Sequence, residues 1–149
     1  MEQREFYMEK ALALAGEAAA AGEVPVGCVI ADSEGRIIGR GRNYREERGD
    51  ACAHAEVLAI QEACRALGSW RLGGCALYVT LEPCPMCAGA IINSRIPTVV
   101  FGARDALTGS CGSVINLFEE KYGHRPAVYG GVLEAECAGI LSDFFKGIR

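Results

Sequence analysis

The motif HAE at residues 54–56 and the run ALYVTLEPCPMC at residues 76–87 are the two stretches around which the rest of this sequence is arranged. Together they supply one histidine and two cysteines, which are side chains that zinc prefers. Three protein ligands, rather than four, leave one coordination position open for water, as in catalytic zinc sites. The carboxylate of Glu56 could move protons for that water. The candidate metal ligands are His54, Cys84 and Cys87.

Both parts of this motif are predicted to begin helices. Cys84 and Cys87 are three residues apart, so at the start of a helix their side chains share one face and can hold one metal ion. Pro85 suits the entry to a helix, because the first-turn N–H groups lack partners there. Since His54 also opens a predicted helix, two helix N-termini would direct partial positive charge at one point and favour the two thiolates.

The position of Glu56 relative to His54 needs a special arrangement. On a regular helix, residues two apart point about 200° away from each other. Both side chains reach one cavity only if that cavity wraps around the first turn, where the N–H of Ala55 or Glu56 is also free to bind a ligand. If Glu56 instead points away, it is a solvated carboxylate that stabilises the helix dipole.

Other interpretations of the cysteines remain open from the sequence. A C-x-x-C pair alone is also typical of redox pairs and of structural zinc sites. Cys52 could replace His54 as a ligand, although it lies before the predicted helix. Cys111 lies in a loop without an evident role, and His124 is interpreted as a structural loop residue. The remaining cysteines fall in apolar patterns and are predicted to be core residues: Cys28, Cys64, Cys75 and Cys137.

The hydrophobic pattern predicts an α/β fold of one domain, residues 1–149. Five predicted strands and four predicted helices alternate, so we expect a three-layer αβα sandwich with a mixed five-stranded sheet and helices on both faces. The closing helix is indicated by apolar residues at helical spacing from Cys137 to Phe145. Residues 45–53 and most of 103–126 are expected to be loops. The predicted helices are 3–21, 54–67, 84–93 and the closing one, and the predicted strands are 24–31, 36–44, 76–81, 99–102 and 127–129.

Composition limits the class of protein. The net charge of −4 argues against a globally basic nucleic-acid binder, although a local basic surface remains compatible with it. No stretch approaches the roughly 18 apolar residues of a membrane span, and the first residues lack the apolar core of a signal peptide. With eight cysteines read as ligands or core residues, we expect a reducing compartment, the cytoplasm.

The order H-x-E followed by P-C-x-x-C resembles the established signature of zinc nucleobase deaminases. The similarity extends over nearly the whole chain to the bacterial tRNA-specific adenosine deaminase family, within the cytidine deaminase-like superfamily. This resemblance implies a homodimer that converts the wobble adenosine in a tRNA anticodon loop to inosine. The segments that carry it are Glu23–Gly27, Gly41–Asn43, Ala53–Glu56, Leu77–Ala90, Val100–Asp105 and Ser142–Phe145.

The resemblance also implies roles for single residues. His54, Cys84 and Cys87 would bind one Zn²⁺ per chain, with Glu56 as the proton shuttle. Asn43 would hydrogen-bond the flipped nucleoside, or else serve as a turn residue at a strand end. The apolar walls of the pocket would be Val26 and Leu81, which are equally good core residues.

The neighbouring nucleotides would lie on aromatic and charged side chains. Phe144 and Phe145 are equally explained as core residues by their helical spacing. The arginines between residues 36 and 48 are offset by acidic neighbours, which favours a solvated surface. Leu107 stands where the family resemblance implies a lysine, so one phosphate contact would be missing. The candidates for the RNA surface are Arg104, Asp105, Phe144, Phe145, Lys146 and Arg149.

Two rival functions follow from the same motif. One is a zinc-dependent deaminase of a free base or nucleoside, such as guanine, cytosine or cytidine, on the same fold. The other is a zinc-stabilised binding module without catalysis, against which Glu56 argues. Hydrolytic deamination of tRNA adenosine is the function that we expect from the sequence.

Overall fold

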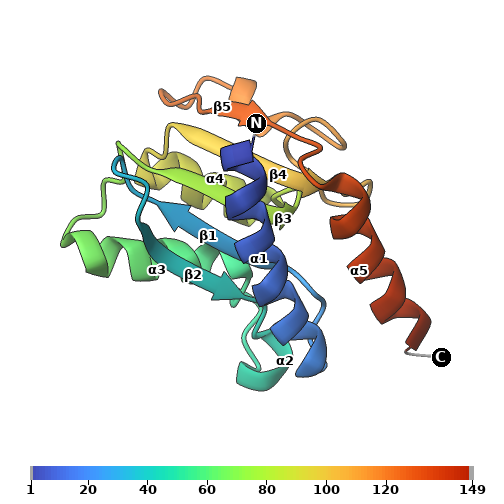
Figure 1. Ribbon diagram of the computed structural model, residues 1–149. Helices are drawn as coiled ribbons and strands as arrows, with labels where there is room; N and C mark the ends of the chain where they lie inside the picture. The colour runs from blue at the N-terminus through green and yellow to red at the C-terminus, as the bar shows by residue number, and fades with distance from the viewer. Residues whose placement is uncertain (1, 148–149) are drawn as a thin grey trace.

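The computed structural model describes residues 2–147 and is built on one five-stranded mixed sheet (Figure 1). The strands lie in the order β2-β1-β3-β4-β5. β1 pairs antiparallel with both β2 and β3, whereas β3, β4 and β5 are parallel to one another. The strands are β1 (Gly27–Ala31), β2 (Ile37–Arg42), β3 (Ala76–Leu81), β4 (Thr98–Ala103) and β5 (Ala127–Tyr129).

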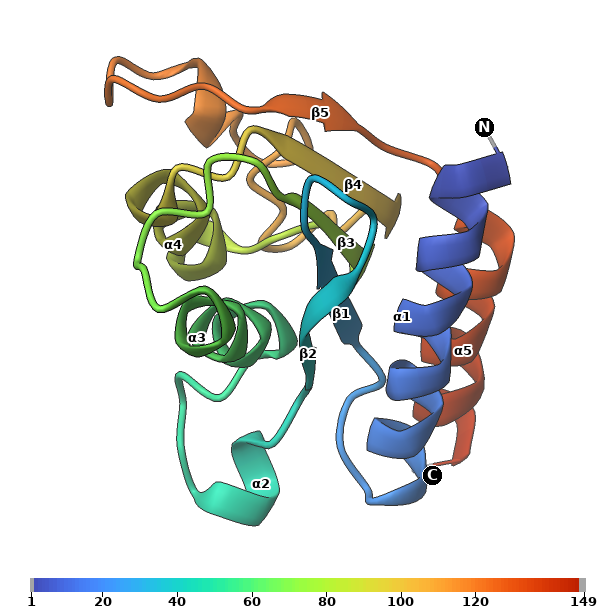
Figure 2. The same cartoon turned by 60° about the vertical axis from the view of Figure 1, so that its left-hand side comes forward.

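Helices cover both faces of this sheet. In Figure 2, α1 and α5 lie side by side on one face, and α3 and α4 lie on the other. The expected α/β fold with a mixed five-stranded sheet is therefore confirmed. No helix among residues 2–147 is long and apolar enough to cross a membrane. The helices are α1 (Glu2–Ala20), α2 (Arg45–Arg48), α3 (Ala55–Leu67), α4 (Pro85–Ser94) and α5 (Glu134–Gly147), with a 3-10 helix at Leu117–Glu119.

The end of α1 fixes the chain segment that leads to the functional region. Met8, Ala11 and Ala15 are fully buried against the sheet, as the apolar stripe of an Ala-rich helix predicts. Gly22 has a φ of +81°, the left-handed conformation that commonly ends a helix. The N–H of Glu23 then donates to the carbonyl of Ala18 at 2.9 Å. These two features fix the position of Glu23 relative to the end of α1.

α3 packs directly against the backbone of β2 at a glycine. A Cβ added to Gly41 would lie 2.1 Å from the carbonyl oxygen of Ala55. That approach sets the position of the N-terminal end of α3 relative to the strands. α4 connects the parallel strands β3 and β4, so its N-terminus lies at the carboxyl end of β3, the edge where ligands bind in α/β folds.

Two predicted loops contain short helices. Residues 45–48 form the single turn of α2 within the predicted loop 45–53. Sequence periodicity cannot detect one turn, and its stability comes from contacts with a distant carboxylate described below. Within 103–126, β4 extends to Ala103 and the 3-10 helix follows. His124 hydrogen-bonds through Nε2 with the carbonyl of Ile96 at 2.7 Å, which confirms it as a structural residue.

Candidate active site

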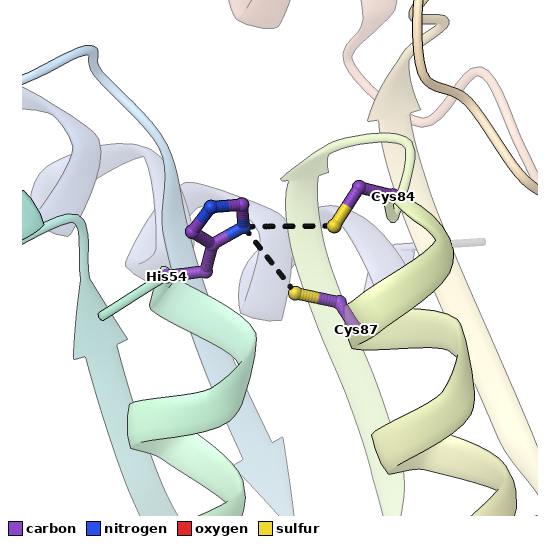
Figure 3. Close-up of side chains that lie close together, drawn as sticks. All are labelled: His54, Cys84 and Cys87. Carbon is purple, nitrogen blue, oxygen red and sulfur yellow. Dashed lines mark hydrogen bonds between the residues drawn. The ribbon is translucent and has the colours of Figure 1, made fainter. Parts of the chain in front are cut away.

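The side chains of His54, Cys84 and Cys87 meet between the N-terminal ends of α3 and α4 (Figure 3). The Nδ1 atom of His54 lies 3.6 Å from the sulfur of Cys84 and 3.5 Å from the sulfur of Cys87. Within the part of the chain that the structure describes, this is the cluster of three such side chains that could hold a metal ion. The exposed Cys52 is not part of it, so His54 is the candidate ligand, as expected.

Helix geometry explains how these groups converge. His54 is the residue before α3 and is extended, with φ −81° and ψ 152°, and Cys84 has the same place before α4. Pro85 is the first residue of α4, and Cys87 lies in its first turn. His54 was expected inside the helix, which made its alignment with Glu56 difficult. Because His54 precedes the helix, its side chain and that of Glu56 can reach one cavity.

Hydrogen bonds within the cluster favour ionisation of one of the two thiols. A hydrogen bond from Cys87 and a second one with His54, despite partial burial, lower the pKa of the Cys84 thiol to about 4. Its hydrogen bond with Cys84, opposed by burial, raises the pKa of His54. The hydrogen bond with Cys84 and then burial raise the pKa of Cys87. One thiol therefore ionises first and accepts hydrogen bonds from both neighbours.

The spacing of the three groups fits zinc. With bonds of about 2.3 Å to sulfur and about 2.0 Å to nitrogen, a nitrogen and a sulfur on a tetrahedral zinc lie roughly 3.5 Å apart. The two nitrogen–sulfur distances of 3.6 and 3.5 Å match this value. Since the donor set is one imidazole and two thiols, it leaves one coordination position for a further ligand.

Glu56 lies beside this cluster and is 4 % exposed. Burial is the largest influence on its carboxyl group, and it raises the pKa of Glu56 to about 7. The negative charge of Cys84 acts in the same direction, whereas a hydrogen bond with Cys87 opposes it. A buried carboxyl group with a pKa near neutrality, next to a metal site, has the properties of a general acid and base.

A cavity of about 340 Å³ opens in front of the cluster. This volume lies within the range of about 300–1,000 Å³ that is typical of small-molecule sites. His54, Glu56 and Cys84 face it from the metal side. The other lining residues come from both sides of the site: Val24, Val26, Asn43, Arg45, Leu81, Glu82, Asp105 and Thr108.

The structure places the predicted pocket residues Val26, Asn43 and Leu81 on this cavity, and Asp105, which was predicted for the RNA surface, also lines it. Ala55 differs from the prediction, because its N–H already donates to Oδ1 of Asn43 at 3.2 Å and its side chain is fully buried. It offers no free donor. Arg104 also lies outside the lining, because its guanidinium lies over the ring of Phe101, 5.3 Å from the centroid.

A second hollow of about 310 Å³ adjoins the first one and shares Val24, Asn43 and Arg45 with it. Phe144 and Phe145 of α5 line this second hollow. Phe145 is 52 % exposed, so it is not a core residue. Lys146 is exposed at the end of the same helix, and Arg149 lies outside the described residues.

Sequence reasoning missed four lining residues: Val24, Arg45, Glu82 and Thr108. A charged residue at the end of the apolar run 76–81 was the available signal for Glu82, since buried carboxylates are rare without partners.

The expected core cysteines Cys28, Cys75 and Cys137 are buried, whereas Cys64 is only partly buried. Cys111, for which no role was expected, is also buried.

Comparison with known proteins decides the family. The model for the cytidine and deoxycytidylate deaminase zinc-binding region matches residues 1–103. The chain belongs to this deaminase family. The matched segment includes all three candidate ligands and Glu56, so the family and the geometry agree on one Zn²⁺ site.

Relatives within this deaminase family extend the match to the full chain. The tRNA-specific adenosine deaminase of Bacillus subtilis (strain 168) is 53% identical over 150 residues, which cover 100% of this chain and 92% of the relative. A solved structure from work on A-to-I editing by tRNA:A34 deaminases has a TM-score of 0.86 and 45% identity, covering 91% of this chain and 99% of that one. The expected resemblance to bacterial tRNA-specific adenosine deaminases is confirmed.

A further solved structure represents a different activity. The guanine deaminase from Bacillus subtilis has a TM-score of 0.64 and 43% identity, covering 67% of this chain and 64% of that one. The fold therefore also occurs in a protein named guanine deaminase. The match to that enzyme is shorter than the match to the tRNA deaminases.

Proposed function

We propose that this protein hydrolytically deaminates adenosine to inosine at the wobble position of tRNA. Full-length similarity to proteins named tRNA-specific adenosine deaminase supports this substrate. The single structural observation that carries the chemistry is the buried carboxyl group of Glu56 beside the cluster of His54, Cys84 and Cys87.

We assign the metal to His54, Cys84 and Cys87. A zinc ion held there supplies a Lewis acid that lets water act as a nucleophile near neutral pH. Glu56 then takes a proton from the attacking water and returns it to the leaving amino group as ammonia departs. Its burial beside the cluster places this one carboxyl group where it can both accept and donate that proton.

The cavity would hold the target base after it has left the stack of the anticodon loop. Val26 and Leu81 provide apolar walls for the purine ring. Asn43 keeps one amide hydrogen and one lone pair beyond its bonds to Val24 and Ala55, and these are available to the nucleoside.

The second hollow supports a polynucleotide substrate rather than a free base. It shares three residues with the first cavity, and the exposed ring of Phe145 lies on it. Stacking of an unpaired base on an aromatic side chain is a common mode of RNA recognition. A nucleotide next to the target could therefore bind there, with Arg45 between the two sites.

The proposal is tested by incubating the zinc-loaded protein with an anticodon stem-loop carrying adenosine at the wobble position. Free adenosine, guanine and cytidine are incubated in parallel, and inosine and ammonia are measured. We expect inosine in the stem-loop and no ammonia from the free compounds. Ammonia only from a free base would assign the protein to the rival activity represented by guanine deaminase.

We also propose a homodimer that works in the cytoplasm, where tRNA is modified. Support for the dimer comes from a hollow of about 260 Å³ between residues of α4 and of the segment 117–122, lined by Gly89, Ile92, Asn93, Leu117 and Tyr122. Tyr122 is 59 % exposed there, and tyrosine is enriched at protein–protein interfaces. Light scattering at micromolar concentration should give about twice the mass of one chain.

A further inference from the structure

Two buried carboxylates flank the cavity and have no part in the proton transfers proposed above. Glu23 is 1 % exposed and Glu82 is 2 % exposed. An ionised carboxylate is unfavourable in the interior unless hydrogen bonds replace its water. The partners of these two side chains therefore indicate which parts of the structure they stabilise.

Glu23 stabilises the short helix on one side of the cavity. Its Oε1 accepts the N–H of Glu46 at 3.1 Å, and its Oε2 accepts the N–H of Glu47 at 2.8 Å. Both donors belong to the first turn of α2, whose own N-cap residue, Tyr44, makes no side-chain bond. A carboxylate from outside the helix thus caps it, and the cavity residue Arg45 is held in place.

Glu82 stabilises the loop on the opposite side. Its Oε1 accepts the N–H of Asp105 at 3.0 Å and the hydroxyl of Ser113, and its Oε2 accepts the N–H groups of Cys111 at 2.9 Å and Ser113 at 3.1 Å. These four donors fill the roughly four acceptor positions of a carboxylate. Glu82 therefore has no acceptor left for a substrate, although it lines the cavity.

Glu82 is connected through Asp105 to a second residue that lines the cavity, Thr108. The carboxylate of Asp105 accepts the N–H of Thr108 at 3.2 Å and its hydroxyl at 2.8 Å, and both residues line the cavity. The loop also packs directly on Glu82, because a Cβ added to Gly109 would lie 2.4 Å from Oε1. Ser110 adds a bond from its N–H to the carbonyl of Pro83 at 2.9 Å.

We propose that Glu23 and Glu82 are positioning residues that hold α2 and the loop 104–113 at the separation that an RNA nucleotide requires. They act through Arg45 on one side and through Asp105 and Thr108 on the other. Because neither carboxylate reaches the reacting atoms, they determine affinity for RNA rather than the rate of the chemical step. This inference rests on the proposed function.

The test uses Glu23→Gln and Glu82→Gln in the zinc-loaded, full-length protein with the anticodon stem-loop. Glutamine keeps the shape of the side chain but directs an amide nitrogen at N–H donors. Each substitution should therefore weaken the hydrogen bonds that hold α2 or the loop 104–113 in place. We expect the KM for the stem-loop to rise by about tenfold, with kcat within about twofold, the pattern of lost uniform binding. Zinc content should stay at one per chain.

Glu62→Gln is the matched control. Glu62 also accepts a backbone N–H, that of Arg40 at 2.9 Å, but it is exposed and does not line either hollow. Its KM should equal that of the wild type. Ser113→Ala is the second variant, because it removes one donor to Glu82 without placing a mismatched amide in the interior, and it should raise KM by about threefold.

The outcomes separate this inference from the proposed function. If the wild type forms no inosine in the stem-loop, the proposed function is wrong. If the wild type is active but KM is unchanged in folded Glu23→Gln and in Ser113→Ala, only the positioning role is wrong. A fall in kcat at constant KM would also contradict it, because that pattern indicates a loss confined to the transition state.

Discussion

The side-chain oxygen of Asn43 accepts a hydrogen bond of 3.2 Å from the N–H of Ala55, which ties the end of β2 to the first turn of α3. Its amide nitrogen donates to the carbonyl of Val24 at 2.9 Å. One side chain thus connects the segment before β1, the end of β2 and the helix that follows His54. The predicted substrate residue is also a structural link.

Asn43→Ala should therefore lower both stability and activity. It leaves the buried N–H of Ala55 without a partner and removes one of the two hydrogen bonds to the carbonyl of Val24, which still accepts the N–H of Val26, at a cost of about 1–3 kcal/mol in the free energy of unfolding. Urea denaturation measures this loss. Asn43→Asp keeps the acceptor for Ala55 and should fall between the alanine variant and the wild type. Wild-type stability of Asn43→Ala would show that water replaces these bonds.

Glu56→Gln should retain zinc and lose activity. Without a carboxyl group beside the cluster, proton transfer to the leaving amine fails, and we expect kcat to fall by a factor of about 10² or more. Metal content is measured by atomic spectroscopy in the same samples. Glu62→Gln, on the exposed side of the same helix, should keep full activity. Substantial turnover by Glu56→Gln would assign the proton transfers to another group.

Removal of zinc should make the thiol of Cys84 reactive, in addition to that of the exposed Cys52. Cys84 is partly exposed, whereas Cys87 is fully buried, so chelation should make Cys84 react quickly and Cys87 slowly with a thiol reagent. Mass spectrometry after alkylation identifies the modified positions. The exposed Cys52 should react equally with and without metal, which provides an internal reference. Equal labelling of Cys84 in both samples would contradict its role as a ligand.

Gly41→Ala should displace α3 from the sheet. The added Cβ would lie 2.1 Å from the carbonyl oxygen of Ala55, which is backbone and cannot rotate away. We expect a loss of about 1–3 kcal/mol in the free energy of unfolding, and weaker zinc binding. Gly16→Ala is the control, because nothing lies within 4 Å of its added Cβ and alanine favours a helix. The control should be at least as stable as the wild type.

Leu107→Lys should strengthen RNA binding. Leu107 is 87 % exposed, and its N–H donates to Asp105, so a lysine there would project from the loop beside the cavity. One additional phosphate contact should make the slope of log K against log salt steeper by about 1. Fluorescence anisotropy with a labelled stem-loop measures this slope. Leu67→Lys, at the opposite end of α3 from His54, should leave it unchanged.

The metal cluster could be predicted from the sequence because its members lie in two short motifs with fixed helical positions. Cys84 and Cys87 share a first turn, and His54 lies before another helix, so local spacing specifies much of the geometry. The mixed sheet could also be predicted from the sequence, since the apolar runs that form β3 and β4 are long enough to be recognised as strands.

The walls of the cavity could not be predicted in this way. Arg45 and Thr108 take their positions from hydrogen bonds that span more than twenty residues of sequence, from Glu23 in one case and from Glu82 through Asp105 in the other. Periodicity carries no information about such contacts. The extended conformation of His54 was missed for a related reason, because sequence patterns locate helix ends only to within a few residues.

Glu82 and Cys84 are separated by a single proline, whereas Glu23 shares no segment with a metal ligand. The wall built on the loop 104–113 is thus held by a residue two positions from a metal ligand, whereas α2 is connected to His54 through residues 49–53. For protein engineering, this makes α2 the half of the site where residues can be exchanged to accept a different nucleic acid. Equivalent changes in the loop act through Glu82 on the segment that carries Cys84, so fewer of them should be tolerated.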